Sequence, residues 1–104
     1  MNLGKLIQEL EAMPSEGVVS FGFARPMSYR GYYNCLAFEP AVDVTIGSML
    51  EYARSANGAV YEGYKGGDYR MDTETDCYIA DYGEYGEDQI STPLIAYWSK
   101  EASV

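Results

Sequence analysis

Apolar residues near the start of the chain recur at steps of three and four, which is the spacing of an amphipathic helix. This pattern predicts a helix over residues 3–13, which Asn2 caps and Pro14 ends. Its apolar positions are Leu3, Leu6, Ile7, Leu10 and Met13. A second helix is predicted after the N-cap Thr45, with Gly58 as its C′ residue. Its apolar face consists of Ile46, Met49, Leu50 and Ala53.

Alternating, β-branched and aromatic residues indicate strands over most of the remaining chain. Strands are expected at residues 18–24, 35–38, 60–65, 68–71, 76–82 and 93–98. Pro26 and Pro40 are expected to end the first two strands, and residues 28–33 form a loop or the start of the second. Acidic residues 83–88 form a turn. The order α-β-β-α-β-β-β-β predicts one α+β domain over residues 1–104, a mostly antiparallel sheet covered by two amphipathic helices.

Composition excludes several classes of protein. An apolar share of 47% rules out a disordered chain, and no apolar run is long enough to span a bilayer. The first residues lack the apolar run of a signal peptide, so a cytoplasmic location is expected. The net charge of −9 disfavours long nucleic acid and anionic membranes as partners. It does not exclude a small nucleotide, because one or two local cations suffice for that ligand.

Catalytic and metal-binding chemistry has little support in the sequence. The chain has no histidine, which removes the commonest general base and most zinc sites, so no catalytic residue, metal or cofactor is expected. Cys35 and Cys77 are interpreted as small buried thiols, and whether they meet in space stays open. The alternating acids of residues 72–76 lack the remaining ligands of a calcium loop, so they indicate a solvated turn. A carboxylate pair for glycoside hydrolysis, drawn from Glu39, Asp68 and Asp81, has no support from spacing.

Two segments combine cations, tyrosines and glycines, and they form the candidate ligand-binding site. Three of the seven Lys and Arg residues fall in them. Arginine suits phosphate, tyrosine offers a flat face and a hydroxyl, and glycine lets a ligand approach the backbone. The pattern therefore predicts a small, flat, anionic ligand. The candidate residues are Tyr29, Arg30, Gly31, Tyr32, Tyr33, Tyr64, Lys65, Gly66, Gly67, Tyr69 and Arg70.

Each of these features also has a purely structural interpretation. Tyrosines are good strand residues, and Arg30 could pair with one of sixteen acids. Gly66-Gly67 suits a hairpin turn as well as a phosphate cradle, and the segment lacks the order of a Walker loop. Five aromatic residues outside the two segments are expected in the core, on the sheet face or at an oligomer interface. They are Tyr78, Tyr82, Tyr85, Tyr97 and Trp98.

Three stretches together resemble a family of small tailed-phage proteins. They are Ser28-Tyr29-Arg30-Gly31-Tyr32-Tyr33-x-x-Leu36-Ala37-Phe38-Glu39-Pro40, Val44-Thr45-Ile46-Gly47-x-Met49-Leu50 and Gly63-Tyr64-Lys65-Gly66-Gly67-x-Tyr69-x-Met71. With residues 75–83 the resemblance covers nearly the whole chain. It implies a phage origin, and so the cytoplasm of an infected bacterium, rather than a particular activity.

By size and chemistry the chain is also similar to phage sponges that sequester immune signalling nucleotides. Such signals include cyclic dinucleotides and ADP-ribose derivatives. The leading hypothesis is therefore a non-enzymatic anti-defence protein, and the alternative is an acidic inhibitor that binds a host defence enzyme directly. Eleven tyrosines and one tryptophan further predict a homo-oligomer, with a dimer first and residues 93–98 as one contact.

Overall fold

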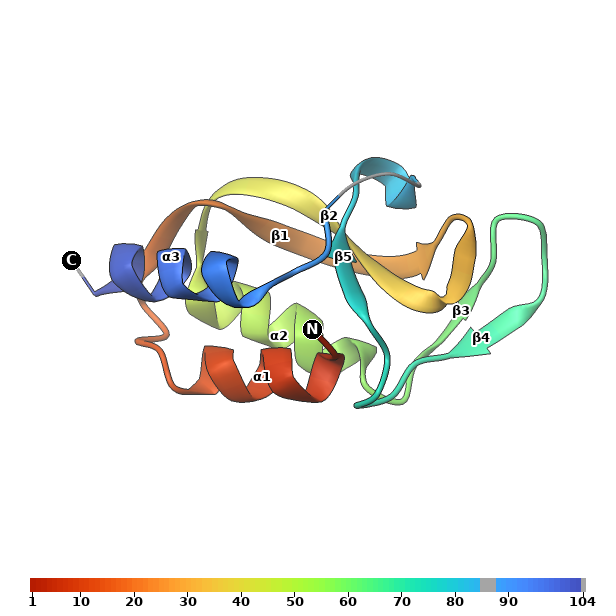
Figure 1. Ribbon diagram of the computed structural model, residues 1–104, viewed down its shortest axis with the longest axis horizontal. Helices are drawn as coiled ribbons and strands as arrows, with labels where there is room; N and C mark the ends of the chain where they lie inside the picture. The colour runs from red at the N-terminus through yellow and green to blue at the C-terminus, as the bar shows by residue number, and fades with distance from the viewer. Residues whose placement is uncertain (85–87, 104) are drawn as a thin grey trace.

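The computed structural model describes residues 1–84 and 88–103 of the chain (Figure 1). The elements in chain order are α1 (Leu3–Glu11), β1 (Val18–Tyr29), β2 (Tyr32–Thr45), α2 (Ile46–Ala56), β3 (Val60–Glu62), β4 (Asp68–Arg70), β5 (Cys77–Ile79), the short 3₁₀ turn η1 (Asp81–Gly83) and α3 (Thr92–Ala102). The predicted α+β class and the mostly antiparallel sheet are confirmed, and the expected order of elements roughly matches.

The sheet is built on one long hairpin. β1 and β2 pair antiparallel, with Phe21 opposite Val42, and β5 adds in parallel beside β2. β3 and β4 form a separate two-stranded hairpin. The molecule measures 43 × 23 × 19 Å, and the turn of β3–β4 lies at the opposite end from α3 (Figure 1). The two hairpin turns therefore share one end of an elongated domain.

Both predicted N-caps are confirmed. Asn2 Oδ1 accepts a hydrogen bond from Lys5 N at 2.9 Å, and Thr45 Oγ1 accepts one from Ser48 N at 3.1 Å. Gly58 follows α2 with φ of +82°, a left-handed conformation that glycine adopts without a Cβ penalty. α1 and α2 pack together below the β1–β2 hairpin (Figure 1). The main core between these layers includes Leu3, Leu6, Leu10, Phe23, Phe38, Ile46, Met49 and Trp98.

The last predicted strand, 93–98, is wrong, because these residues belong to α3. The segment begins after Ser91 with Pro93 in the first turn, a favourable helix start. Its buried residues are Ile95, Trp98 and Ala102, which follow helical rather than alternating spacing. The segment cannot provide a strand contact between protomers, although a homo-oligomer stays a prediction.

α3 covers the outer edge of β1. Trp98 Nε1 donates to the Phe21 carbonyl at 2.7 Å, and both Glu101 carboxylate oxygens accept from Ser20 N, at 3.1 and 3.2 Å. β1 is an edge strand of its sheet, and exposed edge groups invite pairing with other chains. The side chains of α3 thus block part of this edge.

The proline residues do not end the first two strands as expected. β1 continues past Pro26 and β2 continues past Pro40. A register shift between Phe23 and Pro26 bends β1, which accommodates a residue that has no N–H to donate. Arg25 and Glu39 join the two strands near this shift through an ion pair at 3.0 Å.

The two cysteines are free and lie on opposite faces of the sheet. Cys77 pairs with Leu36 and belongs to the main core, whereas Cys35 precedes Leu36 and packs in a second, smaller cluster. Burial raises the pKa of the Cys77 thiol to about 12 and also raises that of Cys35. The interpretation as a buried thiol is therefore confirmed for Cys77, whereas Cys35 is only half-buried.

Within residues 1–84 and 88–103, no helix has both the length and the apolar character needed to cross a bilayer. The predicted acidic turn 83–88 and Tyr85 fall partly or wholly outside the described residues. Of the other aromatic residues in the expected core and interface set, Trp98 is fully buried and Tyr97 is exposed.

Candidate functional site

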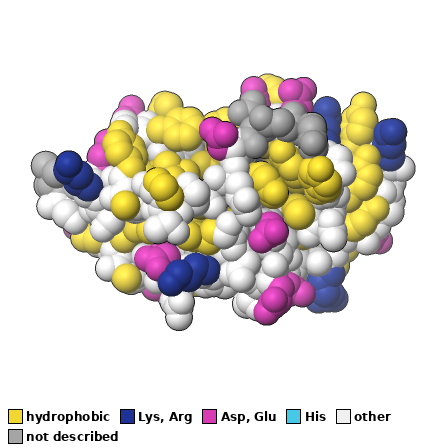
Figure 2. All heavy atoms as spheres, viewed as in Figure 1, with side chains coloured by type: hydrophobic (Ala, Val, Ile, Leu, Met, Phe, Trp, Pro, Cys, Tyr) yellow, Lys and Arg dark blue, Asp and Glu magenta, His cyan; other side chains and the backbone are white. Residues whose placement is uncertain are grey.

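The two sequence segments that predicted a ligand site meet at one end of the molecule. The β1–β2 turn carries Arg30 and Gly31, and the connection between β3 and β4 carries Tyr64 and Lys65. The guanidinium carbon of Arg30 lies 4.0 Å from the centroid of the Tyr64 ring, a cation–π contact. We call this region the paired hairpin ends. Figure 2 shows basic and hydrophobic side chains gathered at this end of the visible face.

Local backbone geometry explains the glycines of both turns. Gly31, Gly66 and Gly67 have φ of +98°, +96° and +84°, which side-chain-bearing residues rarely adopt. The structure therefore accounts for these three residues by turn geometry. A phosphate cradle is not needed to explain them.

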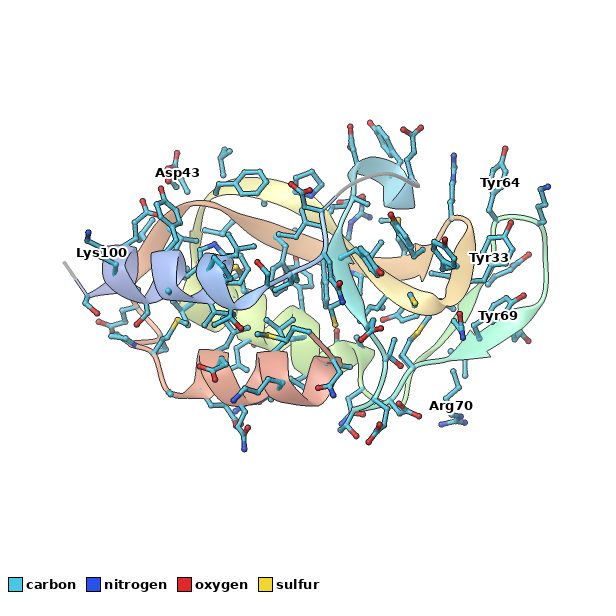
Figure 3. The ribbon with its side chains drawn as sticks, viewed as in Figure 1. Tyr33, Asp43, Tyr64, Tyr69, Arg70 and Lys100 are labelled. Carbon is cyan, nitrogen blue, oxygen red and sulfur yellow. The ribbon has the colours of Figure 1, made fainter. Side chains whose placement is uncertain are left out.

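A second contact between aromatic rings joins the two hairpins. The rings of Tyr33 and Tyr69 pack at 5.6 Å between centroids with a tilt of 46° (Figure 3). Gly63 lies against both rings, and a Cβ there would come within 2.8 Å of the Tyr69 ring and 3.0 Å of the Gly66 carbonyl. Glycine at position 63 is thus a packing requirement of this contact.

Three tyrosine rings form a stack beneath the β1–β2 turn. Tyr29 stacks on Tyr78 at 4.4 Å with an interplanar angle of 3°, and Tyr32 lies 6.2 Å from Tyr29 at 16°. Tyr29 is only 2% exposed, whereas Tyr32 is 50% exposed. Tyr29 therefore supports the turn, and Tyr32 presents a ring to solvent.

Arg30 differs from the arginines that serve as ion-pair partners. Arg25 pairs with Glu39 and Arg54 with Glu11, but no carboxylate among residues 1–84 and 88–103 lies within ion-pair distance of Arg30. The structural interpretation of Arg30 as a salt-bridge residue thus finds no partner in the described part of the chain. Its guanidinium lies instead over the Tyr64 ring.

The other two predicted cations separate from each other. Lys65 is exposed next to Tyr64, so it belongs to the paired hairpin ends. Arg70 lies at the far end of β4 from the turn, opposite Val60, and its Nη1 donates to the Gly58 carbonyl at 3.0 Å. Figure 3 shows Arg70 and Tyr64 pointing to opposite sides of the hairpin. The structure therefore does not bring Arg70 together with Arg30.

One neighbour of the site was not singled out from the sequence. Arg30 N donates to the Gly83 carbonyl at 2.8 Å, which places η1 directly beside the β1–β2 turn. Gly83 has φ of +71°, and a Cβ there would lie 2.9 Å from Met27 Sδ. Tyr82 also has positive φ, +53°, and is 69% exposed. Positive φ at both Tyr82 and Gly83 marks a constrained turn. The sequence Tyr82-Gly83 does not by itself predict this turn.

Other acidic groups have structural roles or offer no anion site. Asp72 Oδ1 accepts a hydrogen bond from Glu74 N at 2.8 Å. This bond stabilises the turn at residues 72–76, which the sequence pattern indicates to be solvated. In the described ranges, no three Cys, Asp or Glu side chains are grouped to hold a metal ion. A cavity of about 570 Å³ lies beside α3, but Asp81 and Asp88 line it, so it suits an anion poorly.

Comparison with known proteins adds no relative: no family model, no curated protein and no solved structure matches this chain.

Proposed function

We propose that this chain is a phage-encoded binding protein that captures a small nucleotide-derived signal at the paired hairpin ends without cleaving it. The observation that carries this proposal is the contact of Arg30 with Tyr64 in the absence of a described carboxylate partner. In a chain of net charge −9, this half-buried arginine pairs with no acid among residues 1–84 and 88–103, so ion pairing within that part of the chain does not explain it.

The chemistry of the paired hairpin ends fits a phosphorylated ligand. A guanidinium that places its face on an aromatic ring keeps its N–H groups along its edge for phosphate oxygens. Lys65 supplies a second, mobile cation near the first. The exposed rings of Tyr32 and Tyr64 offer faces on which a base can stack, an interaction worth about 1–3 kcal/mol per base.

Capture without turnover is the mode of action that these residues favour. The sequence has no histidine, and the paired hairpin ends bring together tyrosines and cations rather than a nucleophile with its base. A protein that removes a defence signal by binding needs affinity and abundance only. ADP-ribose derivatives and cyclic dinucleotides fit the anionic, aromatic chemistry, and the cytoplasm of an infected bacterium is the proposed place of action.

Ligand retention tests the proposal. Purified protein is incubated with ADP-ribose or with cyclic di-GMP, separated from free ligand, heat-denatured and analysed by mass spectrometry. We expect intact ligand to be released in near-stoichiometric amount. Release of a chemically altered ligand would show turnover, and retention of neither ligand would remove the support for a nucleotide-type ligand.

A second candidate function is an acidic inhibitor that binds a host defence enzyme directly. It is favoured by the surplus of acids, because the ion pairs of the described residues neutralise only Glu9, Glu11 and Glu39. A pulldown from host lysate discriminates between the two functions. One stoichiometric host protein that is lost at high salt would favour the inhibitor.

A further inference from the structure

The cavity beside α3 has the size and walls of a small-molecule site. It opens between the sheet and the segment that leads into α3, and its volume of about 570 Å³ lies within the usual range for such sites. Its apolar wall comes from Phe21, Pro40, Ile79 and Leu94. Its polar wall comes from Asp81, Asp88, Gln89 and Ser91. A mostly apolar wall with a few polar groups is typical of a site that orients one ligand.

The two aspartates give the cavity uncompensated negative charge. No Lys or Arg side chain lines the cavity, and every Lys and Arg of the chain lies in the described ranges. The ion pairs of these ranges involve glutamates only, so neither Asp81 nor Asp88 has a cationic partner. Both aspartates are exposed, so their carboxylates are accessible to a cation that enters the cavity.

Backbone hydrogen bonds hold the wall in place. The Asp88 carbonyl accepts from Ile79 N at 3.0 Å, which ties the segment before α3 to β5. The Asp81 carbonyl accepts from Glu84 N at 3.0 Å and closes η1. Ser91 is the N-cap of α3 but makes no side-chain capping bond, so its hydroxyl is not engaged with the helix backbone. These bonds anchor the backbone of both aspartates, and the cavity wall retains polar groups for a ligand.

We infer that this cavity binds a small organic cation, an ammonium or guanidinium group attached to an apolar body. The Asp81 and Asp88 carboxylates attract the cation, and Gln89 and Ser91 supply hydrogen bonds. The apolar body occupies the space beside Phe21 and the rest of the apolar wall. This site prefers the opposite charge to that of the paired hairpin ends, so the two sites do not compete for one ligand.

A matched pair of probes tests the charge preference. The full chain is titrated with 2-phenylethylamine, which is cationic at neutral pH, and with the neutral 2-phenylethanol, while NMR follows the methyl groups of Ile79 and Leu94. We expect both methyl signals to shift with the amine and the amine to bind at least about tenfold more tightly than the alcohol. Equal affinity for the two probes, or no methyl shift up to about 20 mM amine, would overturn the inference.

Matched variants test the residues. Asp81→Asn combined with Asp88→Asn should weaken amine binding at least about tenfold and leave alcohol binding unchanged. Asp43→Asn is the control, because Asp43 is an exposed acid that does not line the cavity (Figure 3) and asparagine tolerates its φ of +52°. If the double variant does not fold, each single variant should still weaken amine binding about threefold or more. Unchanged amine affinity in the folded aspartate variants would contradict the site.

Discussion

Replacement of Trp98 tests the position of α3, the element that the sequence did not predict. The Trp98 side chain is fully buried, 5.7 Å from the Phe23 ring, and its Nε1 donates to the Phe21 carbonyl at 2.7 Å. Trp98→Phe keeps an aromatic ring but removes the donor. The Phe21 carbonyl then loses a hydrogen bond at the edge of β1, which costs about 1–3 kcal/mol, and the smaller ring adds a cavity term of about 1 kcal/mol.

The expected loss in the free energy of unfolding is therefore about 2–4 kcal/mol, a large part of the 5–15 kcal/mol typical of a domain. Urea unfolding followed by circular dichroism measures it, because the only tryptophan is gone from the variant. With a slope of about 2 kcal/mol per molar urea, the midpoint should fall by roughly 1–2 M.

Tyr97→Phe is the matched control on the same helix. Tyr97 is 48% exposed, and its hydroxyl forms a surface hydrogen bond with Ser20 Oγ at 3.1 Å. Its loss should cost less than about 1 kcal/mol. If Trp98→Phe costs no more than Tyr97→Phe, α3 does not pack on β1 through this residue.

Three further predictions concern the thiols, the hairpin contact and assembly. Burial raises the pKa of Cys77 from 9.0 to about 12, so this thiol ionises at lower pH in the unfolded chain than in the folded protein. The free energy of unfolding should therefore be unaffected by this thiol below about pH 9 and should decline between about pH 9 and 12. Cys77→Ala should show a smaller decline over that range in urea midpoints, and an equal decline would contradict the assignment. Gly63→Ala should separate Tyr33 from Tyr69 and lower the melting temperature by several degrees, measured by circular dichroism; an unchanged melting temperature would count against this contact. Light scattering at tens of micromolar protein should give a dimer mass, and a monomer mass would refute the predicted assembly.

The sequence predicts α1 and α2 well because their signals are local. Asn2 and Thr45 form the N-cap hydrogen bonds that their types favour, and the apolar spacing after each cap is helical. The prediction for residues 93–98 fails because a short apolar run fits a strand as well as a helix. Leu94 to Trp98 looks like a buried strand in isolation, and only packing against the edge of β1 distinguishes the helix.

The sequence pattern names the residues of the candidate site but not their arrangement. It selects the tyrosines and cations of both segments by their chemistry, and in the fold Arg30 and Tyr64 meet. Their contact depends on how two hairpins pack, which no local pattern encodes. Arg70 points away because of its register in β4, and Gly83 approaches Arg30 only through the fold.

The affinity of Arg30 variants tests the central claim most directly. Calorimetry measures the Kd of wild type, Arg30→Gln and two controls for whichever of ADP-ribose and cyclic di-GMP the wild type retains. The controls are Arg70→Gln on the same hairpin as Tyr64 and Lys100→Gln at the opposite end of the molecule (Figure 3). Loss of one charge-assisted hydrogen bond costs about 1.5–3 kcal/mol, so Arg30→Gln should weaken binding at least about tenfold while both controls stay within about twofold. A folded Arg30→Gln variant with wild-type affinity, or an equal loss in Arg70→Gln, would contradict binding at the paired hairpin ends.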